Sequence, residues 1–175
     1  LGGLFVGDLG PSVATGQPVS QLLSDRVGSS VLLMVAAALI SIPAGVILGI
    51  VSALRRGKAV DNTVTGLSLV LAALPEFVVG IALVAFFSTT VFTILPAVTM
   101  RPPGSQVWDF PSQLILPIAV LVLVVTPYIA RMMRATMLEV LDSGYVEMAR
   151  LKGVPERRVI FRHALPLSLI HISDG

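Results

Sequence analysis

Three long apolar runs alternate with polar segments along the chain. The runs cover residues 31–54, 63–92 and 112–133. As an α-helix the first run would rise roughly 36 Å, enough to cross a hydrocarbon layer about 30 Å thick. The pattern therefore predicts three membrane-spanning helices, flanked and joined by polar segments at 1–30, 55–62, 94–111 and 134–166.

The basic residues indicate which segments share a side of the membrane. Of the 12 Lys and Arg residues, ten lie within 55–58 and 131–162. Loops on the cytoplasmic side of membrane proteins carry an excess of Lys and Arg. We therefore expect the loop after the first span and the segment after the third to be cytoplasmic, and the other two to be external. Arg131 and Arg134 would anchor the third span at its cytoplasmic end.

Composition supports the membrane assignment and excludes most enzyme chemistry. The chain is 55% hydrophobic and 13% charged, whereas a soluble domain has about 25% charged residues. It has no Cys, no phosphate-binding glycine loop and no histidine–carboxylate set at metal-ligand spacing. Its basic residues are not interleaved with aromatic ones, as nucleic-acid binding would favour. We expect an all-α, polytopic transmembrane bundle with no catalytic site, cofactor, metal or nucleic acid.

Small residues recur every four positions in the first span. Ser41, Gly45 and Gly49 belong to this stripe, which begins at Ala37 and ends at Ala53. In a membrane, a row of small side chains lets two helix backbones approach closely. The alternative is that Ala and Gly are simply common in such helices. We interpret the stripe as a helix-packing surface.

The second span carries a proline and a carboxylate near its middle, at Pro75 and Glu76. Proline interrupts helical hydrogen bonding, and an ionisable side chain at that depth is costly unless it faces the bundle interior or water. Glu76 is therefore either a residue of the translocation path or part of a helix break that stabilises its charge. The residues alone do not choose between these readings.

Residues 142–166 form the one long polar and basic segment. The spacing predicts a helix over 145–152, with Ser143 as N-cap, Gly153 at positive φ ending it, and Pro155 opening a second helix. In the first helix, Tyr145, Met148, Ala149 and Lys152 share one side. This surface suits a groove in another protein. The alternative is a solvated amphipathic loop helix.

The same segment carries a family resemblance. Glu147-Met148-Ala149, Gly153 three residues later and Leu165-Pro166 beyond resemble the EAA loop of bacterial ABC importer permeases. The sequence departs from that pattern at Met148, where the family has Ala, and at His163, where it has Ile. The surrounding residues are similar to the dipeptide, oligopeptide and nickel branch, and the resemblance extends over residues 1–166.

The resemblance implies a fold, a function and a set of partners. The fold would be that of a type I importer permease in the bacterial inner membrane, incomplete at both ends. The chain would form the path for peptides or a similar small solute, with an external solute-binding protein and a second permease, identical or different. A cytoplasmic ATPase would hydrolyse the ATP and dock on the coupling helix through the motif-bearing residues Tyr145, Glu147, Met148, Ala149, Leu151 and Gly153.

Two other function classes remain open from the residues. One is an ion-coupled secondary transporter that uses Glu76 and has no ATPase, and the other is a membrane interaction subunit without transport. Residues 167–175 read LSLIHISDG, which resembles a translated sequencing-library adapter. Our hypothesis is that this tail is not native, so no role is expected for it.

Overall fold

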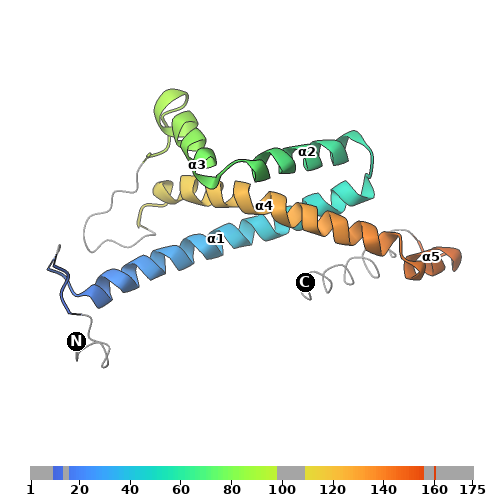
Figure 1. Cartoon of the computed structure of the whole chain (residues 1–175), viewed down its shortest axis with the longest axis horizontal. Coiled ribbons are helices and arrows are strands. Elements are labelled where there is room, and N and C mark those ends of the chain that lie inside the picture. Colours follow the sequence, from blue (N-terminus) through green and yellow to red (C-terminus); the bar gives the residue numbers. More distant parts are fainter. Residues whose placement is uncertain (1–9, 14–15, 98–108, 156–159, 161–175) are drawn as a thin grey trace.

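The computed structural model describes residues 10–13, 16–97, 109–155 and 160. Within these residues the chain is helical, with no β-strand, so the predicted all-α class is confirmed (Figure 1). The elements in chain order are α1 (Val19–Leu54), α2 (Ala59–Ala73), α3 (Glu76–Val84), the π-helical turn η2 (Ala85–Thr90), α4 (Ser112–Leu141) and α5 (Gly144–Leu151).

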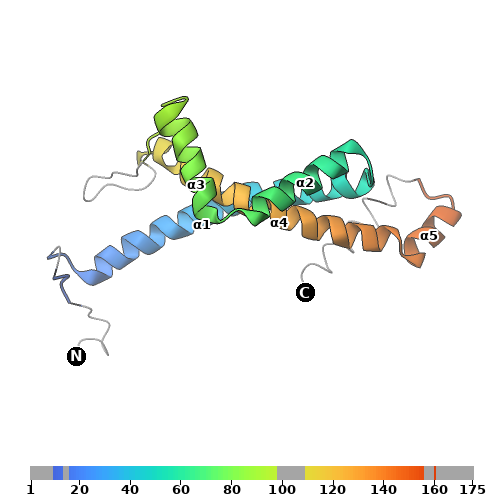
Figure 2. The ribbon, with the colours of Figure 1, turned by 45° about the horizontal axis from the view of Figure 1, so that its top comes forward.

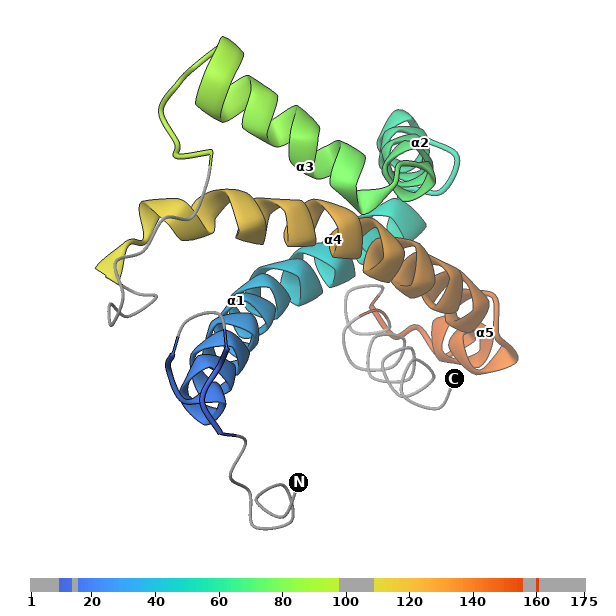
Figure 3. The same ribbon diagram turned by 60° about the vertical axis from the view of Figure 1, so that its left-hand side comes forward.

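The longest helices, α1 and α4, form the framework of the described chain. Each is long and apolar enough to cross a membrane. The two helices pack against each other more extensively than any other pair, and α4 also contacts α2, α3 and α5. Figure 3 shows α4 crossing α1, with α3 on the opposite side of α4. The central helix is therefore α4, and it leads directly toward α5.

Helix α1 begins earlier than the apolar run predicts. It starts at Val19, after Pro18, and has 36 residues, whereas the hydrophobic pattern places the first span at 31–54. The residues in between are mixed polar and apolar, yet they continue the helix because a helix needs only compatible backbone conformations, not uniform hydrophobicity. The predicted polar segment at 1–30 is thus partly helical.

The second predicted span is two helices at a sharp angle. α2 ends at Ala73, and α3 together with η2 continues from Glu76, bent by 100° relative to α2. Leu74 has an extended backbone, as expected for a residue before proline. Pro75 lacks an N–H and cannot continue the hydrogen bonding of α2. Figure 2 shows α3 rising away from α2.

A buried apolar cluster lies where α1, α4 and α5 meet. It consists of Ala53, Met133, Met137, Val140 and Val146. Many apolar side chains elsewhere on α1 are exposed, among them Met34, Leu39 and Ile47. In a bilayer such side chains contact lipid or neighbouring helices. The cluster thus fixes one end of the helix framework, the end that carries α5.

Candidate coupling surface

Helix α5 follows α4 after a two-residue turn. The backbone N–H groups of Val146 and Glu147 both donate to the Ser143 carbonyl, each at 3.1 Å, which closes the first turn of α5. The Ser143 hydroxyl instead donates to the Val140 carbonyl at 2.6 Å. Ser143 thus occupies the predicted N-cap position, but its carbonyl accepts the first bonds of α5 and its hydroxyl bonds to the end of α4 instead of to α5.

The two sides of α5 differ sharply in burial. Val146 is 0% exposed and belongs to the buried cluster, and Ala149 packs against that cluster. On the other side Tyr145, Met148 and Leu151 are 55%, 60% and 75% exposed. The expected grouping of Ala149 with Tyr145 and Met148 is corrected, because Ala149 turns toward the core and Leu151 joins the exposed side. We name Tyr145, Met148 and Leu151 the α5 apolar face.

The end of α5 is set by its glycine. Gly153 has a φ of 71°, the positive value predicted for it. The Val154 N–H donates to the Ala149 carbonyl at 3.2 Å, the six-to-one bond of a Schellman motif. Val154 and Ala149 both pack on the buried cluster. The glycine therefore turns the chain back onto the core and leaves the α5 apolar face exposed.

Asp61, in the first turn of α2, is the centre of a buried polar network. Its Oδ1 accepts from the Ser52 hydroxyl at 2.5 Å and from Arg134 Nε at 2.6 Å. Its Oδ2 accepts from the Gly57 N–H at 2.9 Å and from Arg134 Nη2 at 2.9 Å. The two-pronged contact with the guanidinium is the strong, directional form of a charge pair. Residues from α1, the α1–α2 turn and α4 are thereby joined at one carboxylate.

A second ion pair joins the same two regions at the surface. Arg56 Nη1, in the α1–α2 turn, lies 3.1 Å from Asp142 Oδ2, and both side chains are exposed. Exposed pairs of this kind contribute about 0.2–1 kcal/mol. The chain between the end of α1 and the first turn of α2 therefore contacts the C-terminal part of α4 twice, once through Asp61 and once through Arg56.

The stripe of small residues on α1 faces α4. A Cβ added at Gly45 would lie 2.6 Å from Ile129 Cβ, and one at Gly49 would lie 2.7 Å from the Ala130 carbonyl oxygen. Ser41, one turn earlier, is buried. Both glycines lie so close to α4 that any side chain there would push the helices apart.

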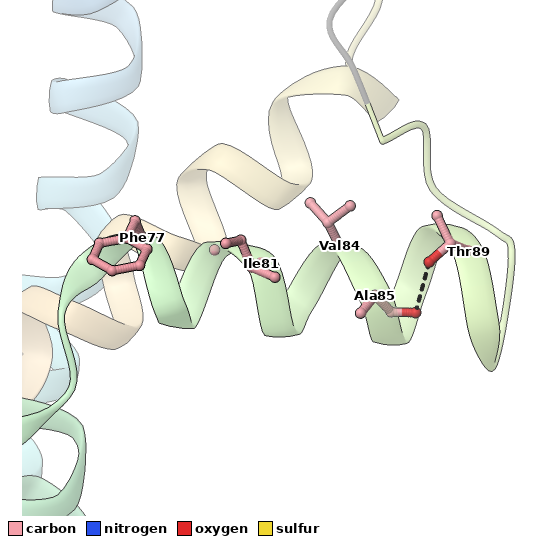
Figure 4. A pocket seen from close by; sticks show the side chains of 6 residues that line it. Phe77, Ile81, Val84, Ala85 and Thr89 are labelled. Atoms are coloured by element: carbon pink, nitrogen blue, oxygen red, sulfur yellow. Dashed lines mark hydrogen bonds between the residues drawn. The ribbon is translucent and has the colours of Figure 1, made fainter.

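Pro75 and Glu76 lie at the bend between α2 and α3. The Val78 and Val79 N–H groups donate to the Pro75 carbonyl, which begins α3, and Glu76 is exposed in its first turn. Beside it, α3 and η2 border a shallow apolar hollow of about 500 Å³ (Figure 4), lined by Phe77, Gly80, Ile81, Val84, Ala85 and Thr89. In Figure 1 the bend lies well away from α5, which is at the far right of the view.

Asp61 was not among the residues predicted from the sequence, and Arg134 was expected to anchor its span, with contact to an ATPase or to lipid as the alternative. One signal was available: a carboxylate at the start of one apolar span and an arginine at the end of another, predicted on the same side of the membrane. The sequence around each residue does not indicate its partner, because the two residues are 73 positions apart.

The second helix predicted from Pro155 and the 167–175 tail lie outside the described residues. Within the described residues, no group of three His, Cys, Asp or Glu could hold a metal.

Long apolar helices, small residues at their crossing and a short helix held at one end define a helical membrane protein. The chain belongs to the family of inner membrane components of binding-protein-dependent transport systems, whose sequence model matches residues 45–173. This confirms the family resemblance found in the sequence and, with it, the permease fold class.

Curated relatives carry peptide-transport names. The chain is 37% identical over 169 residues to a putative peptide transport system permease protein of Brucella abortus (strain 2308), covering 97% of this chain and 54% of the relative. It is 35% identical over 167 residues to the oligopeptide transport system permease protein OppB of Salmonella typhimurium (strain LT2), covering 95% and 52%. The chain thus spans about half the length of the curated relatives it matches.

Proposed function

We propose that the chain is part of the membrane-spanning permease subunit of an ATP-driven importer in the bacterial inner membrane. It would cross the membrane several times and contribute to the path for peptides or a similar small solute. Family membership and the peptide-transport names of the relatives support this proposal. The family assignment favours it over an ion-coupled transporter or a membrane subunit without transport.

The proposal rests on the way α5 is packed, with one side buried and the other exposed. A helix of eight residues is marginal alone, but Val146 is fully buried and holds it on the ends of α1 and α4. Its opposite side presents three large apolar side chains, which a soluble surface rarely clusters without a partner. We propose that the α5 apolar face, with Glu147 beside it, docks on a cytoplasmic ATPase subunit.

The proposed assembly contains further partners. A second permease subunit, identical or different, would complete the path, and an external solute-binding protein would deliver the solute. Displacement of α5 by the ATPase would bias the helix bundle between two arrangements, because a partner shifts a conformational equilibrium only by differential binding. Glu76 and the bend at Pro75 are candidates for the path, and Gly45 and Gly49 for the packing that supports it.

The test uses the full-length subunit co-expressed with an ATPase, a second permease and a solute-binding protein of the same transport system. Glu147→Lys reverses an exposed charge on α5, and Gly153→Pro removes the turn that orients it. We expect both variants to reach the membrane but to lose ATP-driven uptake of a labelled tripeptide mixture. Glu139→Lys, the same charge reversal at an exposed position of α4, is the matched control and should transport normally.

Co-purification separates the function classes in the same preparation. An ATPase that purifies with the wild-type subunit and with Glu139→Lys, but less with Glu147→Lys, supports docking at α5. A wild-type subunit that takes up solute and never retains an ATPase would instead indicate ion coupling. Wild-type uptake rates in both Glu147→Lys and Gly153→Pro would refute the coupling role of α5.

A further inference from the structure

The buried ion pair between Asp61 and Arg134 fixes the position of α2 relative to α4. Charged groups pay a large desolvation cost when buried, so such a pair adds little net stability compared with apolar residues of similar size. What it supplies is geometry, because the guanidinium fork fixes both distance and orientation. Here the carboxylate also accepts from Ser52 and Gly57, so it cannot follow Arg134 without carrying the α1–α2 turn.

The pair also lies next to the support of α5. Arg134 follows Met133 and precedes Met137, and both methionines belong to the buried cluster that holds Val146 of α5. A displacement of α5 therefore acts on the segment of α4 that bears Arg134. Close-packed interiors transmit such displacements rather than absorb them. Through Arg134 and Asp61 the displacement reaches the first turn of α2.

The continuity ends at the other end of α2. The α2 helix and the α3–η2 unit are bent by 100° across Leu74 and Pro75, and no N–H of proline links the two. The helix is therefore interrupted between α2 and α3, although α3 also packs against α4. The ion pair lies on the α2 side of this interruption and joins α2, rather than α3, to the part of α4 that supports α5.

We infer that Asp61 and Arg134 are positioning residues that make α2 move as one body with α4 and α5 in the transport cycle. This inference rests on the proposed function, because it assumes that an ATPase displaces α5. It assigns a role in coupling to two residues outside the α5 segment.

The first experiment measures distances in the complete transporter without altering the ion pair. Spin labels are placed on exposed positions by Gly144→Cys on α5 with either Asn62→Cys on α2 or Ala82→Cys on α3. This chain has no cysteine of its own, so it adds no background label. Between the nucleotide-free and ATP-bound complexes, we expect an unchanged 62–144 distance. The 82–144 distance shows whether α3, which also packs against α4, moves with the same body.

The outcomes separate the two hypotheses. A 62–144 distance that changes on ATP binding, with the ATPase bound, overturns this inference alone. An unchanged 62–144 distance in a complex that binds the ATPase and hydrolyses ATP supports it. If the ATPase does not bind at all, the proposed function fails, and this inference fails with it.

The second experiment asks whether the pair itself couples the movement. Arg134→Gln removes the charge and the fork, whereas Arg134→Lys keeps the charge. Uptake of a labelled tripeptide mixture per ATP hydrolysed should fall about tenfold in Arg134→Gln, in the range of coupling between sites, and should largely recover in Arg134→Lys. A purely structural role would lower the amount of complex but leave this ratio unchanged, which would overturn the assignment.

A second variant keeps the role of the pair testable if Arg134→Gln fails to fold. Asp61→Asn retains the size of the side chain and removes the negative charge. It keeps one acceptor oxygen, so it can accept from Ser52 or from Gly57, which donate to different oxygens of Asp61. In this variant the 62–144 distance should broaden or shift on ATP binding, although it is constant in the unsubstituted protein. An Asp61→Asn complex with the unsubstituted distance and the unsubstituted ratio of uptake to hydrolysis would contradict the role of the pair.

Discussion

At Gly49, where α1 and α4 approach closely, the effect of adding a single methyl group on protein stability can be worked out from the structure. A Cβ there would lie 2.7 Å from the Ala130 carbonyl oxygen and 2.7 Å from Met133 Cβ, against 3.4 Å for ordinary contact, so the helices must separate locally by about 0.7 Å. One contact is backbone, which cannot move away by rotating a side chain. Overpacking of this kind costs about 1–3 kcal/mol.

The helix propensity of alanine opposes this cost and must be removed by a control. Gly→Ala within a helix gains roughly 0.5–1 kcal/mol. Gly66, inside α2, offers the matched substitution, because a Cβ added there meets nothing within 4 Å. We therefore expect Gly49→Ala to be less stable than Gly66→Ala by about 1–3 kcal/mol, the packing term alone.

The measurement is unfolding of the purified protein in mixed micelles, with increasing dodecyl sulfate and helix content followed by circular dichroism. The midpoint and slope of each transition give the difference in free energy of unfolding between the two variants. A graded series at Gly49, from Ala to Val, should become progressively less stable. Equal unfolding free energies for Gly49→Ala and Gly66→Ala would refute the close approach of the two helices.

Three further outcomes follow from burial, charge and backbone conformation. Met133→Ala should lower the free energy of unfolding by about 2–5 kcal/mol, because Met133 is 0% exposed; Met132→Ala, at a position 36% exposed, should cost much less in the same unfolding assay. Arg56→Ala should cost no more than about 1 kcal/mol, because its ion pair is exposed, and a larger loss would show that the surface pair is structural. Gly153→Ala should destabilise the protein by about 1–2 kcal/mol because its φ is positive, whereas Gly144→Ala, which has open space and no positive φ, should not; equal thermal stability of these two variants would contradict the assigned backbone conformation.

The short helix and its turn were readable from the sequence because they depend on neighbours along the chain. The predicted helix at 145–152 corresponds to α5 at Gly144–Leu151, and Gly153 has the predicted positive φ. The side-chain capping of α5 could not be predicted from the sequence. Ser143 is a favoured N-cap residue, but its hydroxyl bonds to the preceding helix instead, a choice that depends on how closely α4 and α5 follow each other.

Burial on α5 shows the same limit. Helical spacing shows that Tyr145, Met148 and Ala149 lie near one another. It does not determine which of these residues faces the core. The buried cluster on α4 decides it, because Val146 packs in one cluster with Met137 and Val140, which turns Ala149 inward and Leu151 outward. Periodicity describes a helix relative to itself, whereas burial is a relation between two helices.

The lengths of the apolar runs and the placement of basic residues determined, without coordinates, that this is a helical membrane protein, because bilayer thickness and helical rise fix how many apolar residues a span needs. Only the tertiary structure decided that α1 begins at Val19, that α2 and α3 meet at 100° and that Asp61 pairs with Arg134. Contact between residues far apart in the chain depends on the register in which α1, α2 and α4 cross, and that register is set by the packing of all three helices together.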